Sequence, residues 1–311
     1  MALFLPGRRD AARARRMLEP MDALVPAHLD HTREWARFDY CYPVISRRSG
    51  GVSLGVNLNP DKRCNFNCVY CEVDRCTPPR RKDVDLDQLV AEMAALMDLV
   101  ASGELFARPP FDTARPAQRR PNDLAFSGDG EPTTASCFAA CVARLADLKR
   151  ARGLDAVKLV LITDSTRLQA PEVAAGLETL MANQGEIWAK LDAGTEAHYR
   201  QVNRSLVPYS RILENLLIAG RRWPLTLQTL LLEWQGRGIS DAEFEAYLAC
   251  VRGLQERGAQ FRGVQLYTVA RPTPEPDARP LAAAELDRRA AQLRAELPDL
   301  PVEVFYGPDR A

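Results

Sequence analysis

The sequence of 311 residues carries no net charge, because 41 Lys and Arg residues balance 41 Asp and Glu residues. It has no apolar run close to the roughly 20 residues that cross a bilayer. Its opening apolar stretch is too short for the core of a signal peptide, and arginines follow it. A general affinity for polyanions, a membrane span and export are therefore disfavoured, and we expect a cytoplasmic protein.

Histidine is scarce, whereas cysteine is clustered. The three histidines show no zinc-like spacing with the eight cysteines. A chain of this length buries enough surface to need no disulfide or metal for its core. In a reduced compartment, clustered cysteines more often bind metal or carry out redox chemistry. Five cysteines are scattered, and three fall within eight residues: Cys64, Cys68 and Cys71.

Apolar segments indicate an alternation of strands and helices. Residues 52–58 alternate apolar and polar side chains, which predicts a strand. Continuous apolar strands separated by amphipathic helices indicate a parallel α/β sheet covered on both faces. We therefore predict a partial (β/α)6 TIM-like barrel, with a doubly wound sheet as the alternative. Further strands are expected at 124–127, 157–162, 187–191, 225–232, 264–269 and 302–306, and helices at 85–100, 135–149, 171–181, 210–219, 240–254 and 281–297.

Two segments lack a clear period. Residues 1–50 are predicted to form an N-terminal extension that packs on the barrel domain of residues 51–311. Residues 103–122 are rich in proline and arginine and are expected to form a surface loop.

The three clustered cysteines follow the first strand of the barrel, and parallel α/β folds place their chemistry at such strand ends. Soft thiolates favour zinc, copper(I) or iron–sulfur clusters. A structural zinc site needs four ligands, which Cys76 would complete. Three ligands on a four-iron cluster leave one iron open, as a reactive metal requires. The cysteines alone do not decide between a zinc site and an iron–sulfur cluster.

A second motif, Gly128, Asp129, Gly130 and Glu131, follows the next strand. The glycines allow a sharp turn and close backbone approach. The carboxylate of Glu131 can accept hydrogen bonds from an ammonium group. Taken alone, the segment is either a turn that binds a cation or an ordinary turn between a strand and a helix.

Together the two motifs resemble the radical S-adenosylmethionine superfamily, whose members bind a [4Fe–4S] cluster through Cys-x3-Cys-x2-Cys. Tyr70 matches the family's aromatic residue before the third cysteine, and the Gly128 to Glu131 turn resembles its Gly-Gly-Glu motif, with a departure in the middle. The resemblance implies that S-adenosylmethionine binds the open iron and that one electron cleaves it. The products are methionine and a 5′-deoxyadenosyl radical, which abstracts hydrogen from a substrate. An electron donor of flavodoxin or ferredoxin type is also expected.

Polar residues at later strand ends extend the predicted site. In the superfamily, residues at these levels contact the ribose, carboxylate and adenine of S-adenosylmethionine. The pattern also predicts that Lys190 points into the barrel, with Asp192 on the same side of its strand. The positions are Thr163, Asp164, Lys190, Asp192, Gln228 and Tyr267.

The segment from about residue 52 to 306 resembles a branch of the superfamily grouped near the tRNA wyosine-base synthases. RNA is therefore one hypothesis for the substrate, and local basic clusters can contact phosphates. A non-catalytic zinc or iron–sulfur module remains the alternative function. The basic clusters are Arg8 to Arg16, Arg80 to Lys82, and Arg115, Arg119 and Arg120.

Overall fold

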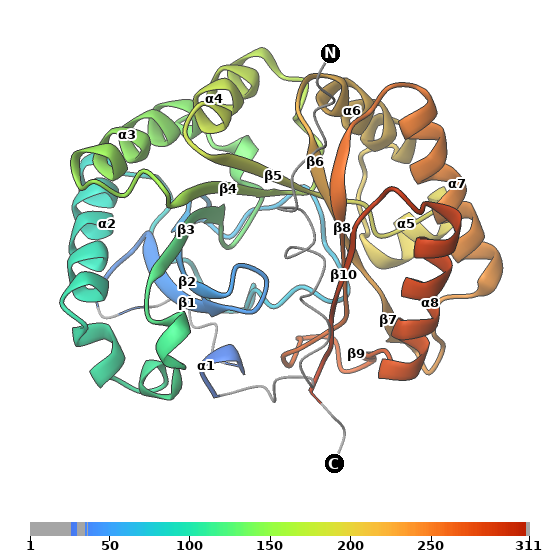
Figure 1. Ribbon diagram of the computed structural model, residues 1–311, viewed down its shortest axis with the longest axis horizontal. Helices are drawn as coiled ribbons and strands as arrows, with labels where there is room; N and C mark the ends of the chain where they lie inside the picture. Colours follow the sequence, from blue (N-terminus) through green and yellow to red (C-terminus); the bar gives the residue numbers. More distant parts are fainter. Residues whose placement is uncertain (1–25, 30–34, 36, 309–311) are drawn as a thin grey trace, which may run out of the picture.

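The computed structural model describes residues 26–29, 35 and 37–308 (Figure 1). A single curled sheet of eight strands forms its centre, and its strand order is β1-β2-β3-β4-β5-β6-β8-β10. The strands are β1 (Cys41–Ser46), β2 (Gly51–Asn57), β3 (Pro121–Ser127), β4 (Lys158–Thr163), β5 (Gly185–Lys190), β6 (Leu225–Leu230), β8 (Phe261–Tyr267) and β10 (Val302–Phe305).

Six long helices cover the outside of this sheet, and its inner face encloses the centre of the molecule (Figure 1). They are α2 (Leu86–Ala101), α3 (Phe138–Ala151), α4 (Pro171–Met181), α6 (Tyr209–Arg222), α7 (Asp241–Glu256) and α8 (Ala283–Glu296). Smaller elements are α1 (Pro26–Leu29), α5 (Glu196–Val202) and the two-stranded sheet of β7 (Leu232–Trp234) and β9 (Ala278–Pro280).

The arrangement confirms the predicted partial TIM-like barrel. From β2 to β10 neighbouring strands of the curled sheet run parallel, and their order follows the chain. A doubly wound sheet would reverse its strand order at a switch point, so that alternative is wrong. Each outer helix carries the chain back to start the next parallel strand, which brings all strand ends that precede a helix to one rim.

Side chains alternate between the two faces of the sheet. Leu124 and Phe126 of β3 join the main core beneath the helices. Ala125, between them, packs instead with Val160 and Trp188 in a separate inner cluster. The inner face is thus apolar midway along β3, β4 and β5 and polar at their carboxyl ends, where the predicted site residues lie.

The first strand of the sheet, β1, was not predicted. It pairs antiparallel with β2, with Tyr42 opposite Gly55, so residues 41–46 of the predicted extension belong to the sheet. Glu92 of α2 holds the start of β1, because its carboxylate accepts hydrogen bonds from the backbone N–H groups of Tyr40 at 2.9 Å and Cys41 at 3.1 Å. The segment Arg8 to Arg16 lies outside the described residues.

Residues 103–122 are more ordered than the predicted surface loop. They contain the 3₁₀ helices η1 (Glu104–Ala107), η2 (Phe111–Thr113) and η3 (Pro116–Gln118). Leu105, Phe106 and Phe111 are buried in the main core. These apolar residues have no regular spacing, so their burial left no periodic signal in the sequence. Within the described residues, no helix is long and apolar enough to cross a membrane.

Candidate functional site

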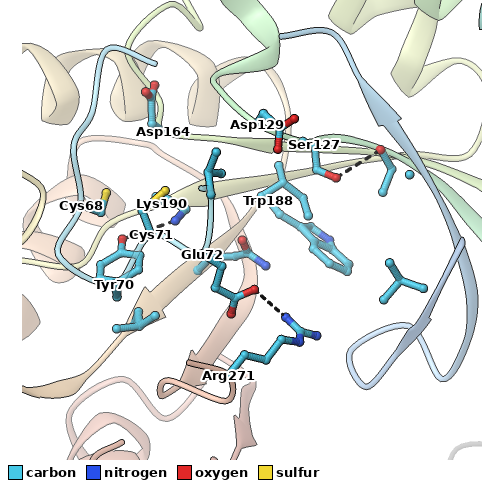
Figure 2. Close-up of a pocket in the computed structure, with 18 of the residues that line it drawn as sticks. Cys68, Tyr70, Cys71, Glu72, Ser127, Asp129, Asp164, Trp188, Lys190 and Arg271 are labelled. Carbon is cyan, nitrogen blue, oxygen red and sulfur yellow. Dashed lines mark hydrogen bonds and ion pairs between the residues drawn. The ribbon is translucent and has the colours of Figure 1, made fainter. Parts of the chain in front are cut away.

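A cavity of about 260 Å³ opens at the carboxyl ends of the strands. Figure 2 shows Cys68, Tyr70, Cys71 and Lys190 along one side of it, with Trp188 and Ser127 on another. Of the predicted site residues, Asp192 alone is not on the cavity wall. The others all line it: Cys64, Cys68, Tyr70, Cys71, Gly128, Asp129, Gly130, Glu131, Thr163, Asp164, Lys190, Gln228 and Tyr267.

The three predicted metal-binding cysteines are free thiols, half-buried at the cavity wall. Each sulfur accepts one N–H hydrogen bond: Cys64 from the backbone of Phe66 at 3.5 Å, Cys68 from Asn203 at 3.6 Å and Cys71 from Arg75 at 3.6 Å. Such hydrogen bonds stabilise sulfur ligands and tune the potentials of iron–sulfur clusters. The donor set therefore fits a thiolate-bound cluster.

Two of the three thiols have raised pKa values. Burial raises the pKa of Cys64 to about 12, and the charge of Asp164 adds to this effect. Burial likewise raises the pKa of Cys68 to about 11. No three metal-ligating side chains of the described residues are gathered into a finished metal site. Metal binding would therefore displace protons and draw the three sulfurs together.

Cys76, which would complete a four-thiolate zinc site, is exposed and lies outside the residues that line the cavity. Its backbone N–H donates to Asp74 at 2.8 Å, in a turn beyond the cysteine loop. The described structure thus brings three of the four candidate thiols to one cavity.

The glycine turn after β3 packs directly against the cysteine loop. Gly128 has a φ of +133°, which favours glycine. A Cβ on Gly130 would meet the carbonyl oxygen of Arg63 at 2.0 Å. Asn57, the last residue of β2, also holds the glycine turn in place. Its side chain donates a hydrogen bond to the carboxylate of Asp129 at 2.7 Å and accepts one from the Asp129 backbone N–H at 3.1 Å. The predicted sharp turn and close approach are both confirmed.

Two carboxyl groups, Glu131 and Asp164, are buried next to each other at this turn. Glu131 accepts hydrogen bonds from the hydroxyl of Thr163 at 2.8 Å and the backbone N–H of Asp164 at 2.6 Å. Burial, and then the charge of Glu131, raise the pKa of Asp164 well above its usual value. The Oδ2 atom of Asp164 is buried and has no hydrogen-bond partner.

This acidic pair is suited to a cation. No Lys, Arg or His of the described chain forms an ion pair with either carboxyl. An ammonium group placed against the pair would satisfy the orphaned oxygen and lower the pKa of Asp164. The predicted role of the turn as a cation site therefore fits its surroundings.

Lys190 points into the barrel, as predicted, and reaches Asp192 through a tyrosine. Its Nζ atom donates to the hydroxyl of Tyr70 at 3.4 Å, and that hydroxyl donates in turn to Asp192. Asn203 completes the group by donating to Asp192 at 2.8 Å. Burial acts to lower the pKa of Lys190, but Tyr267 and the other nearby groups outweigh it and raise the pKa.

Asp192 therefore lies behind Tyr70 and not on the cavity wall. Its second oxygen accepts from the backbone N–H of Leu230 at 2.9 Å, which ties β5 to β6. Elsewhere on the wall, Gln228 donates to Gln265 at 2.9 Å, and its own side-chain oxygen is buried without a partner.

The sequence reasoning missed several residues of the cavity wall. Arg271 forms an ion pair with Glu72 at 2.9 Å, which Figure 2 shows below the cysteine loop. Tyr42 of β1 hydrogen-bonds Ser127 at 2.9 Å across the inner face. Arg47 and Arg48, in the turn between β1 and β2, also line the cavity. The turn residues Ser49 to Gly51 between two apolar runs were a usable hairpin signal.

Comparison with known proteins gives distant relatives. No family model matches the sequence. The chain is 24% identical over 185 residues to UPF0026 proteins of two Helicobacter pylori strains, covering 57% of this chain and 53% of theirs. It is also 24% identical over 178 residues to a UPF0026 protein of Methanocaldococcus jannaschii, covering 57% of this chain and 47% of that one. The chain spans about half the length of these curated relatives.

Similar solved structures include TYW1 with a lysine–pyruvate adduct bound (TM-score 0.47, 16% identity) and archaeal TYW1 (0.42, 13%), each over 78% of this chain and 72% of the other. A third is the cobalamin-dependent S-adenosylmethionine radical enzyme OxsB (0.41, 10%), over 64% of this chain and 26% of the other. In its motifs the chain resembles radical S-adenosylmethionine proteins of the branch near the wyosine synthases. Because these TM-scores lie below 0.5, the structural likenesses say nothing of what this chain binds.

Proposed function

We infer that this chain is a radical S-adenosylmethionine enzyme whose Cys64, Cys68 and Cys71 hold a four-iron cluster. One observation carries this inference: three free thiols and a buried acidic pair line the same cavity. Soft sulfur donors suit an iron–sulfur cluster, and the acidic pair suits the ammonium of an amino acid. When bound, the cluster supplies the electron that cleaves S-adenosylmethionine into methionine and a 5′-deoxyadenosyl radical.

The chain's own residues hold the reactants in place. The N–H groups of Phe66, Asn203 and Arg75 donate to the three sulfurs and stabilise their thiolate forms. Glu131 and Asp164 bind and orient the ammonium group. The apolar inner cluster below them keeps water from the radical.

Metal content tests the cysteine assignment. We expect anaerobically reconstituted protein to contain about four irons and four sulfides per chain. Cys68→Ala should lose most of the iron, whereas Cys76→Ala, the matched control at an exposed thiol, should keep it. One zinc per chain in place of iron would support the non-catalytic zinc module instead. Equal iron loss in both variants would support a non-catalytic iron–sulfur module in which Cys76 is the fourth ligand.

Binding of S-adenosylmethionine tests the acidic pair. Glu131→Gln keeps the size of the side chain and removes its charge, so we expect S-adenosylmethionine to bind about tenfold or more weakly. Glu245→Gln, on the exposed face of α7, serves as the control. Release of 5′-deoxyadenosine with reductant should fall in the first variant and not in the second. Unchanged affinity of Glu131→Gln would remove the turn from the site.

RNA as the substrate and a flavodoxin- or ferredoxin-like electron donor remain proposals. Some of the basic side chains that motivated the RNA hypothesis are engaged within the chain: Arg81 pairs with Asp39 at 2.9 Å, and Arg119 donates to the carbonyl of Ala114 at 3.0 Å. Phosphate contacts predict that total tRNA binds and that added salt weakens the binding. Absence of binding at low salt would exclude tRNA.

A further inference from the structure

The cavity carries charged groups of both signs. Glu131 and Asp164 lie at the glycine turn beside the cysteine loop. Besides Arg75 of the cysteine loop, three arginines line the cavity: Arg47 and Arg48 from the β1–β2 turn, and Arg271 from the segment after β8. The proposed function accounts for the acidic pair and for Arg75, and it leaves the other three arginines without a role.

Arg48 is the central member of this arginine group. Its guanidinium lies 4.2 Å from the centre of the Tyr267 ring. Within the described chain it forms no hydrogen bond or ion pair, and burial lowers its pKa. An arginine stays charged in such a place, so its five N–H donors are available to a molecule that occupies the cavity.

The neighbouring arginines add to the positive charge. Arg47 donates a hydrogen bond to the carbonyl of Tyr306. Burial, and then the charges of Arg48 and Arg271, lower the pKa of Arg47 to about 10, while Glu72 acts in the opposite direction. Among the described residues, the carboxylate of Glu72 pairs with Arg271 and acts on the pKa values of Arg47 and Arg48. A bound anion would further offset the mutual repulsion of the three guanidinium groups.

Tyr267 lies near two cations of the cavity. The guanidinium of Arg48 is 4.2 Å from the centre of its ring. Burial raises the pKa of Tyr267, and the charges of Lys190 and Arg48 lower it. Lys190 also donates to the hydroxyl of Tyr70 in the cysteine loop.

Arg48 also lies at the floor of the cavity. Arg48 and Trp188 line both this cavity and a second one of about 240 Å³ lower in the barrel. The β1–β2 turn thus forms a partition between the two spaces. A molecule that enters from the strand ends meets Arg48 and Trp188 at the bottom of the upper cavity.

Resting on the function proposed above, we propose that Arg47, Arg48 and Arg271 bind a carboxylate or phosphate group of the substrate. The substrate is then a small anionic molecule whose charged group lies on the partition and whose reacting carbon faces the cysteine loop. Guanidinium groups suit this task because their planar forks match both oxyanions in two-point contacts.

Anion binding by the anaerobic, cluster-loaded protein tests the proposal. The probes are inorganic phosphate and acetate, and their binding is followed by calorimetry and by tryptophan fluorescence, to which Trp188 on the cavity wall contributes. We expect saturable binding of at least one probe, weakened about tenfold or more in Arg48→Gln. Arg211→Gln, at an exposed ion pair with Glu214, is the matched control and should bind as wild type does. Preference for phosphate indicates a phosphate ester, and preference for acetate indicates a carboxylic acid.

Three results would overturn the proposal: no saturable binding of either probe, equal binding by Arg48→Gln and wild type, or an Arg48→Gln variant that loses affinity for S-adenosylmethionine to the same extent. The last would assign the arginines to the carboxylate of S-adenosylmethionine. Iron content and the thermal midpoint, measured on each preparation, must match wild type in Arg48→Gln. Failure of the proposed function shows separately, as wild-type protein without iron or without 5′-deoxyadenosine.

Discussion

The contact between the glycine turn and the cysteine loop predicts the effect of a single methyl group. In Gly130→Ala, the new Cβ would stand 2.0 Å from the carbonyl oxygen of Arg63 and 2.7 Å from the Cβ of Asn59. Carbon and oxygen atoms do not approach so closely, so the two segments must separate by about 1 Å or more. Arg63 directly precedes Cys64, and the separation therefore moves the first metal ligand.

The loss of folding free energy in Gly130→Ala follows from overpacking between two backbone segments. Inserting a methyl group into a filled contact costs about 1–3 kcal/mol. For a chain of this size that corresponds to a fall of about 2–5 °C in the thermal midpoint. We also expect iron incorporation and S-adenosylmethionine affinity to fall further than this modest destabilisation explains, because the displaced segment carries a ligand.

Gly253→Ala is the matched control, because Gly253 lies within α7 and a Cβ there meets nothing within 4 Å. Alanine should stabilise that helix by about 0.5–1 kcal/mol and leave iron content unchanged. Both variants are measured by urea unfolding, by iron analysis and by titration with S-adenosylmethionine. If Gly130→Ala unfolds and loads iron as wild type does, the two motifs do not touch in the way described.

Two further substitutions test the frame that carries the site. Glu92→Ala leaves the buried N–H groups of Tyr40 and Cys41 without their acceptor, so we expect a loss of about 3–5 kcal/mol in urea unfolding; a loss below about 1 kcal/mol would contradict this anchoring of β1. Burial raises the pKa of Asp123 above its ordinary value of 3.8. Between the pKa of the unfolded chain and the higher pKa of the folded protein, the folded state therefore keeps a proton that the unfolded state releases. The free energy of unfolding falls as pH rises between these two pKa values. Asp123→Asn should remove that slope and melt higher than wild type at neutral pH; parallel melting curves from mildly acidic to neutral pH would refute it.

Local patterns in the sequence were sufficient for most of the fold. Alternating and continuous apolar runs predicted every parallel strand of the barrel to within a few residues, because burial on both faces leaves that pattern in the chain itself. Helix α4 begins at Pro171 and ends at Met181, as predicted, since proline marks a first helical turn. Strand β1 was missed, because an edge strand needs a partner and its pattern shows neither register nor direction.

Part of the candidate site could also be predicted from the sequence, and part could not. Cys64, Cys68, Cys71 and Glu131 could be found from the sequence, since spacing within one loop fixes which groups can converge and parallel strands end at one rim. The position of Asp192 behind Tyr70 was not predictable, because the tyrosine comes from a loop over a hundred residues away in the chain.

The arginine end of the cavity was decided by tertiary structure alone. Arg47 and Arg48 reach the wall because β1 pairs with β2, and Arg271 meets Glu72 because the curl of the sheet brings the end of β8 back toward the cysteine loop. Spacing along a chain determines contacts within a turn or a helix. Contacts between distant segments depend on register, twist and sheet closure, which arise only when the whole sheet forms.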